Sequence, residues 1–214
     1  MRGITNAQGI TGPHLNGILE RLSLLENNPP VGSVTTFAGF DWVVVHWDTA
    51  LKRMYLMLKG ISTKTTWADS ASEHVPYENS NVKAELISFN GAFERLIFGS
   101  HAVTAQRLEV SRLEKKGGAY AFIPTKEEFL SFCLFEQPAV SYVGDDLFSH
   151  YECALVRSEG LLYGWWLSGS GKTDDGQCYY IGENAEILAL DGVASETSSG
   201  LQYGVRPFII MKMR

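Results

Sequence analysis

The residues best suited to chemistry lie at 169–173, in the segment Gly-Ser-Gly-Lys-Thr, which contains part of the pattern of a phosphate-binding loop. That pattern requires a glycine five residues before Gly171, and Trp166 occupies the position. No predicted helix follows the segment, so no helix N-terminus is offered to a phosphate. A polar turn between two strands is the better interpretation, and we expect no nucleotide binding.

Other candidate ligands are also poorly arranged. The acidic pairs Asp145-Asp146 and Asp174-Asp175 lack the further spaced oxygen ligands of a calcium loop, so turn or solvated positions are favoured. No two of the five histidines have the spacing that places both side chains on one metal-binding face of a helix. His46 is expected to be half-buried in an apolar strand. Cys133, Cys153 and Cys178 form no C-x-x-C pair and are expected to be reduced. We therefore predict no catalytic residue, no metal and no cofactor, hence not an enzyme.

Aromatic and polar residues in the last third of the chain favour binding. Trp165-Trp166 and Tyr179-Tyr180 lie in predicted strands, where neighbouring side chains point to opposite faces. One member of each doublet would then be exposed, as on many recognition surfaces. A second layer that buries both faces is an equally good alternative. Under the recognition hypothesis the ligand-binding residues are Lys172, Asp174, Asp175, Tyr179 and Tyr203.

Composition restricts the classes of partner. The chain has 214 residues, of which 45% are apolar and 20% are charged, with a net charge of −6. The absence of a concentrated basic face argues against nucleic acid, and no apolar run approaches the length of a membrane span. Residues 1–8 have no apolar core of signal-peptide length. We expect synthesis in the cytoplasm, followed either by retention there or by exit through a route that needs no signal, such as cell lysis or assembly into a virion.

Residues 1–30 are predicted to be a separate N-terminal tail and helix. Pro13 suits a first helical turn, and Asn27-Asn28-Pro29-Pro30 ends the helix. Apolar residues at spacings of three and four form a seam at Leu15, Ile18, Leu22 and Leu25. Read as heptads, this seam favours bundles larger than dimers, so it would attach the protein or oligomerise it. Packing of the seam on the parent domain is an equally good alternative.

Residues 31–214 have the pattern of an α+β domain with a mainly antiparallel sheet, because the connections are short and no β-α-β alternation is present. Helices are predicted at 81–98, with Val82, Leu86, Phe89, Phe93 and Leu96 on the buried face, and after the capping box at Thr125. Residues 60–80 are predicted to be a polar loop. Strands are predicted at 34–37, 42–47, 54–58, 121–124, 162–167, 177–181, 187–190 and 205–211.

Several segments together resemble a known family. Trp165-Trp166-Leu167, followed by Tyr203-Gly204-Val205-Arg206-Pro207-Phe208, resembles the W-W-L-R-S … G-V-R-P-A signature of a bacterial and prophage domain family of unknown function. Residues 37–44, Phe-Ala-Gly-Phe-Asp-Trp-Val-Val, are similar to its opening hairpin, and residues 79–82 and 122–128 to its middle segments. The resemblance covers residues 31–212 and implies a C-type-lectin-like fold, related to that of formylglycine-generating enzymes.

The signature implies structural roles for Trp165, Trp166, Gly204, Arg206 and Pro207. We expect Val205 in the core, Pro207 at a limit of strand pairing, and Arg206 anchoring a loop by charge-assisted hydrogen bonds. Ser168 and Gly169 stand where the family has Arg and Ser, and Phe208 replaces a small residue. No paired active-site cysteines are identifiable, so formylglycine-generating activity is not implied.

The same fold resembles phage tail-fibre tips and the variable proteins of diversity-generating retroelements, which bind hosts and are often trimeric. The resemblance implies a phage or prophage tail-associated adhesin in the virion, with other tail proteins and a host cell-surface glycan or protein as partners. A homo-oligomer, with a trimer favoured, is implied too. Residues 165–206 lack the asparagine excess of an actively diversified loop set. The alternatives are a scaffold protein of the virion or cell without a receptor site, and a divergent enzyme with a deep pocket.

Overall fold

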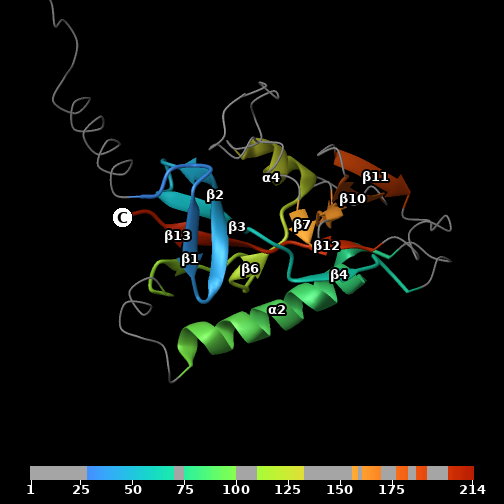
Figure 1. The fold of residues 1–214 in the computed structure, drawn as a ribbon, viewed down its shortest axis with the longest axis horizontal. Coiled ribbons are helices and arrows are strands. Elements are labelled where there is room, and N and C mark those ends of the chain that lie inside the picture. Colours follow the sequence, from blue (N-terminus) through green and yellow to red (C-terminus); the bar gives the residue numbers. More distant parts are fainter. Residues whose placement is uncertain are drawn as a thin grey trace, which may run out of the picture.

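The computed structural model describes residues 28–69, 75–99, 110–132, 156–158, 161–169, 177–182, 187–191 and 202–214. Within these residues, an α+β architecture of mostly antiparallel sheets and two α-helices confirms the predicted class (Figure 1). No described helix has the length and apolarity needed to cross a bilayer. The predicted N-terminal helix at 13–26 lies outside the described residues, so its seam is not placed.

The first sheet begins with the predicted hairpin. β1 (Val34–Phe37) and β2 (Phe40–Asp48) are joined by Ala38 and Gly39, whose φ angles are 54° and 79°. Two consecutive positive φ angles characterise the two-residue turn that matches the natural twist of a hairpin. β3 (Arg53–Leu58) pairs with β2, and the late strand β13 (Phe208–Lys212) pairs with β3. The short strands β5 (Leu113–Glu114) and β6 (Ala121–Phe122) both pair with β13.

The second sheet has the strand order β11-β10-β9-β12-β4. Its pairs are antiparallel except for the contact of β12 with β9, where Gly204 lies opposite Trp165 in parallel orientation. A separate hairpin is formed by β7 and β8. The bounds are β4 (Thr63–Thr65), β7 (Val156–Ser158), β8 (Leu161–Tyr163), β9 (Trp165–Trp166), β10 (Gln177–Ile181), β11 (Ile187–Asp191) and β12 (Tyr203–Val205).

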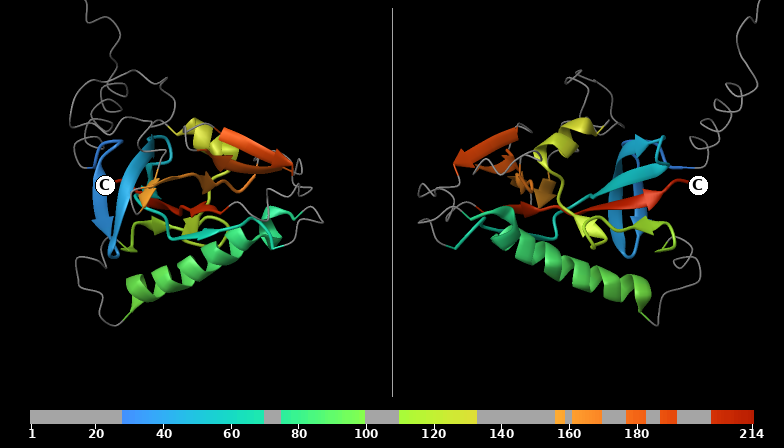
Figure 2. Two further views of the ribbon diagram at one scale, coloured as in Figure 1. Left: turned by 45° about the vertical axis from the view of Figure 1, so that its right-hand side comes forward. Right: turned by 180° about the vertical axis from the view of Figure 1, so that it is seen from behind.

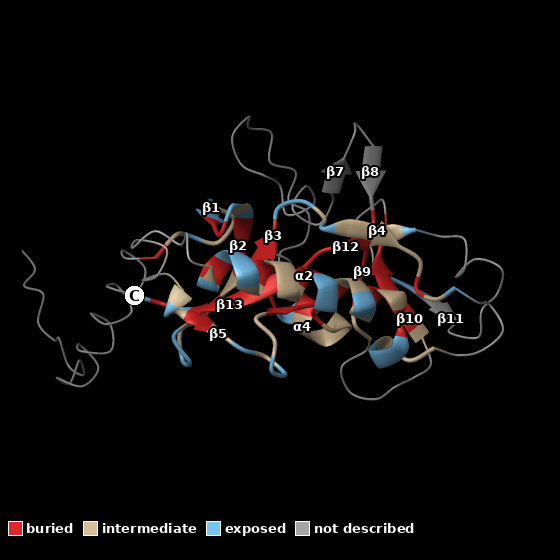
Figure 3. Ribbon diagram, turned by 90° about the horizontal axis from the view of Figure 1, so that it is seen from below, coloured by how far each residue is buried: buried red, intermediate tan, exposed pale blue. Residues whose placement is uncertain are grey.

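The two helices cover opposite sides of the sheets (Figure 2). α2 (Asn81–Phe98) begins at Ser80, whose hydroxyl accepts a hydrogen bond from the Lys83 backbone N–H. It buries its apolar face in a core that includes Trp42 and Trp166. α4 (Lys126–Ser131) carries the predicted capping box and packs Phe129 into a second core. Figure 3 shows the buried strands behind α2, whose outer surface is exposed.

Four predictions of local structure are wrong. The expected strand 162–167 is two strands divided at Gly164, and the expected strand 205–211 is divided at Arg206-Pro207. Residues 60–80 contain β4 and a short 3-10 helix, η1 (Tyr77–Asn79), because β4 is held by pairing with the distant β12. On α2, Leu96 is 48% exposed and Ile97 takes the expected core position.

Candidate functional site

Three of the five predicted ligand-binding residues, Lys172, Asp174 and Asp175, lie outside the described residues. They belong to the connection from β9 to β10, whose first residues are described. The Lys126 backbone N–H donates to the Gly169 carbonyl at 2.8 Å, and the Ser168 N–H donates to the Pro124 carbonyl at 3.0 Å. The start of this connection is therefore fastened to the beginning of α4.

The expectation of one exposed aromatic ring in each doublet is wrong. Trp165, Trp166, Tyr179 and Tyr180 are all buried. Successive residues do point to opposite faces of the second sheet, but both faces are covered. Trp166 and Tyr180 belong to the core beneath α2, while Trp165 and Tyr179 belong to the core beneath α4. The covering-layer alternative is therefore the arrangement found.

The other two predicted residues, Tyr179 and Tyr203, are described, and both rings pack within the protein. Tyr179 is 5% exposed, the Lys126 ammonium lies 4.8 Å from its ring centroid, and its hydroxyl is 3.0 Å from Gln177 Oε1. Burial of its ring corrects the expectation that Tyr179 presents a surface to a ligand. Tyr203 is half-buried and stacks on Tyr180 with ring centroids 4.3 Å apart. One face of the Tyr203 ring is thus already used within the protein.

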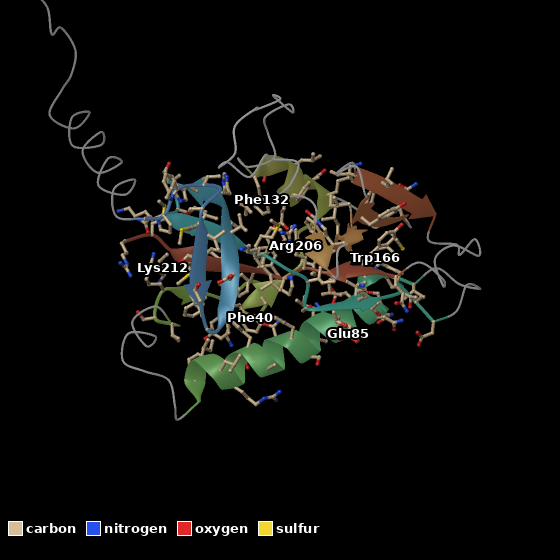
Figure 4. The ribbon with its side chains drawn as sticks, viewed as in Figure 1. Phe40, Glu85, Phe132, Trp166, Arg206 and Lys212 are labelled. Carbon is tan, nitrogen blue, oxygen red and sulfur yellow. The ribbon has the colours of Figure 1, made fainter. Side chains whose placement is uncertain are left out.

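Arg206 joins the two sheets. Its side chain is 1% exposed, and its Nε and Nη2 donate to the carbonyls of Leu58 and Lys59 at 2.8 and 3.0 Å. The guanidinium also lies 5.6 Å from the Trp165 ring centroid. Next to it, the Pro207 carbonyl accepts a hydrogen bond from the Leu58 N–H at 2.9 Å. Figure 4 shows Arg206 near the middle of the molecule, where the chain passes from β12 to β13.

Close backbone approach explains two glycines at this junction. The Gly204 N–H donates to the Gly164 carbonyl at 2.9 Å. A Cβ at Gly164 would overlap the carbonyl oxygen of Ile181, and a Cβ at Gly204 would overlap the Ile61 side chain. Glycine is thus required where the strands of the second sheet meet, which gives the Gly204 of the signature a steric reason.

At one end of the molecule, Asn28 ties the beginning of the described chain to its last residues. Its amide nitrogen donates to the Arg214 carbonyl at 3.3 Å, and its amide oxygen accepts from the Arg214 N–H and from Arg112 Nη2, both at 3.0 Å. Asn28 is only 5% exposed. β10 and β11 lie at the opposite end of the long axis from the end marked C (Figure 1).

A second cluster of chemical groups was not predicted. His46, Tyr55 and Phe132 form a ring cluster, with centroids 5.5 Å apart for His46 and Tyr55 and 5.3 Å for Tyr55 and Phe132. His46 was expected to be half-buried, and it is. Its pairing with Tyr55 depends on a β-bulge between Val44 and His46, and no sequence pattern indicated that bulge.

Charged groups surround Tyr55. Arg53 Nε lies 2.6 Å from Glu114 Oε2, and Lys116 forms an ion pair with Glu128 of α4. Burial raises the pKa of the Tyr55 phenol, and the carboxylates of Asp48, Glu128 and Glu114 raise it further, whereas Arg53 lowers it. The phenol therefore stays neutral at physiological pH and can both donate and accept a hydrogen bond.

Among the described residues, no group of three or more His, Cys, Asp and Glu side chains can hold a metal ion. Cys178 is a buried, reduced thiol, as expected, and Cys133 and Cys153 lie outside the described residues. No protein-family model, no curated protein and no solved structure matches this chain. The family resemblance therefore stays a prediction from the residues that carry it.

Proposed function

We propose that this protein is a receptor-binding component of a phage or prophage tail, with a C-type-lectin-like domain that recognises a host cell-surface glycan or protein. The residues before Asn28 attach the domain to other tail proteins or to further copies of the chain, with a homotrimer favoured. The connections between the late strands of the second sheet, among them residues 168–176 between β9 and β10, meet the receptor.

One observation carries this proposal, namely the opposite placement of the two ends of the domain. Asn28, the first described residue, is hydrogen-bonded to Arg214 and Arg112 at one end of the long axis. β10 and β11 lie at the other end, and the candidate connection 168–176 leads into β10 (Figures 1 and 2). A domain held at one end and free at the other suits an adhesin, because attachment leaves the far end accessible.

The fold assignment is supported by the positions of the signature residues. Trp165, Trp166, Gly204, Arg206 and Pro207 are all buried and lie in or beside β9, β12 and the start of β13. They therefore act on the junction of the two sheets and not on a ligand. Receptor contact is left to Lys172, Asp174 and Asp175, in a connection whose start is held by α4.

Adsorption measurements test the receptor proposal. Replacing Lys172, Asp174 and Asp175 together by alanine should abolish binding of the purified full chain to host cells. The matched control replaces Glu94 and Lys115, which form an exposed ion pair of 3.8 Å, and should bind normally. Unchanged adsorption of the triple variant would contradict the assigned receptor residues. Immunogold labelling should place the protein on virions, and its absence from purified particles would overturn the tail assignment.

A scaffold role in the virion is the second candidate, and the burial of both aromatic doublets favours it. An adhesin surface usually exposes aromatic rings, whereas Trp165, Trp166, Tyr179 and Tyr180 all face protein. The same experiment separates the two functions. A protein that is present in particles, but whose triple variant supports normal adsorption, is a scaffold.

A further inference from the structure

The outer face of α2 carries an apolar stripe. Ile87 and Phe98 are 61% and 59% exposed, which makes them the two most exposed large apolar side chains among the described residues. Ala84 and Gly91 lie on the same side of the helix, because spacings of three, four and seven residues bring all four positions to one face. Figure 3 shows the outer surface of the helix exposed. We call Ala84, Ile87, Gly91 and Phe98 the α2 stripe.

Gly91 has no explanation within the described chain. A glycine in the middle of a helix costs about 1 kcal/mol relative to alanine. Outside the backbone of α2 itself, the nearest atom to a Cβ on Gly91 would be Arg95 Nη1, at 4.0 Å, so no described neighbour requires a glycine there. Between two large exposed side chains, a residue without a side chain leaves room for an apolar residue of another helix. The α2 stripe therefore has the pattern of a helix-docking surface.

The N-terminal seam has a matching length and pattern. Its four apolar residues repeat at spacings of three and four between Leu15 and Leu25, which are ten positions apart, or about 15 Å along a helix. Ile87 and Phe98 are eleven positions apart, or about 16 Å. A helix as short as the predicted one at 13–26 is marginal in water without an apolar partner, so the seam needs such a surface.

Charge favours this segment over a second folded domain as the occupant of the stripe. Residues 1–27 contain two arginines and two glutamates and so have no net charge, which leaves the whole net charge of −6 on residues 28–214. Two such domains docked on each other would repel, whereas a neutral segment meets no such repulsion.

The segment comes from a neighbouring copy, because the tether of the chain's own seam is too short. Asn28 is fixed at the end of the first sheet by hydrogen bonds to Arg214 and Arg112. Leu25 is three residues before Asn28, and three residues span at most about 11 Å. The outer face of a helix lies one helix diameter, about 10–12 Å, beyond the surface on which the helix packs. The whole tether would be used in passing around α2, with nothing left to lie along the stripe.

We propose that the α2 stripe is the docking surface for the N-terminal seam of a neighbouring copy of this chain. Each copy gives its seam to one neighbour and receives the seam of another. Such a head-to-tail contact closes into a ring when the rotation from copy to copy fits, and one third of a turn gives the favoured trimer. The inference rests on the oligomerisation in the proposed function and names the surface that serves it.

The test measures the mass of the full chain by light scattering, with variants on each side of the contact. Phe98→Asp removes an apolar anchor of the stripe and should raise the Kd of association at least about tenfold, and Leu22→Asp should do the same from the seam. Gly91→Leu improves the helix propensity of α2 but fills the stripe, so it should dissociate the oligomer without loss of folding. Leu130→Asp, at a half-exposed leucine of α4, should leave the mass unchanged.

Mixing two dissociated variants distinguishes this contact from a bundle of seams. Leu22→Asp keeps its stripe and Phe98→Asp keeps its seam, so a concentrated equimolar mixture should form a heterodimer through one intact contact. Absence of the heterodimer, or an unchanged mass of folded Phe98→Asp, would overturn the docking surface. A monomeric full chain that still adsorbs to host cells would overturn the docking alone and leave the receptor proposal in place.

Discussion

Replacement of Arg206 by methionine should strongly destabilise the protein, because this side chain holds the first sheet to the second. Methionine keeps a long apolar stem but removes the hydrogen bonds to the carbonyls of Leu58 and Lys59. Hydrogen bonds from a charged donor contribute about 1.5–3 kcal/mol each, which gives a loss of about 3–6 kcal/mol. Methionine also avoids the cost of burying the guanidinium charge, which offsets part of this loss. We therefore expect the free energy of unfolding to fall by about 3 kcal/mol, near the lower limit.

Urea denaturation followed by tryptophan fluorescence measures this loss, with the m value checked to ensure that the same surface unfolds. A loss of about 3 kcal/mol corresponds to a fall in Tm of about 6–12 °C for a chain of this size. Arg206→Lys keeps the charge but not the planar group that reaches two carbonyls, so its loss should be about half as large.

The matched control is Arg95→Met on the exposed surface of α2, which should change the free energy of unfolding by less than about 0.5 kcal/mol. An Arg206→Met variant as stable as this control would refute the assigned role of Arg206. Equal losses in the Lys and Met variants would show that the two-carbonyl geometry matters and that the charge alone does not.

Three further changes test other parts of the fold. Gly164→Ala should lower the free energy of unfolding, measured by urea denaturation, by about 3 kcal/mol, because the new Cβ meets the Ile181 backbone. The control Gly60→Ala has open space around its Cβ and should show no such loss. Equal effects of the two changes would refute the steric argument. Lys52→Gly should raise stability by about 0.5–1 kcal/mol by relieving a positive φ of 53°, and Lys52→Ala should not. Burial, and then the charge of Glu78, raise the pKa of Tyr77 above its ordinary value of 10.0. The stability that the neutral Tyr77 phenol contributes is therefore fully present below pH 10.0 and is lost as the pH rises above that value. Urea melts at alkaline pH should accordingly show a smaller loss of stability in Tyr77→Phe than in the unmodified protein. An equally steep loss in the two proteins would contradict this reasoning.

Local patterns predicted the elements whose causes are local. The hairpin at 34–48, α2 and the capping box of α4 follow from turn residues, helical spacing and one four-residue motif. The anchoring role expected of Arg206 is what its two hydrogen bonds provide. Leu96 was misplaced by one position because both 96 and 97 are apolar, and the spacing of three and four allows either.

Elements with distant causes could not be predicted. β4 is a polar Thr-Lys-Thr segment that becomes a strand only by pairing with β12. The division at Arg206-Pro207 arises because the chain changes sheets there, and its sequence remains strand-like on both sides. Similarly, the bulge before His46 is visible only once its opposite strand is known. The ring cluster of His46, Tyr55 and Phe132 was missed for that reason.

The passage of residues 203–212 through both sheets has a consequence for synthesis on the ribosome. Arg206 reaches back across 148 positions to Leu58, and β13 fills the place between β3 and the β5 and β6 strands. Until these late residues emerge, the earlier hairpin has an unpaired apolar edge, which attracts other chains. Such distant closure also folds slowly. The nascent protein therefore depends on protection of that edge during translation, and truncation before residue 203 should yield aggregates in place of a smaller folded domain.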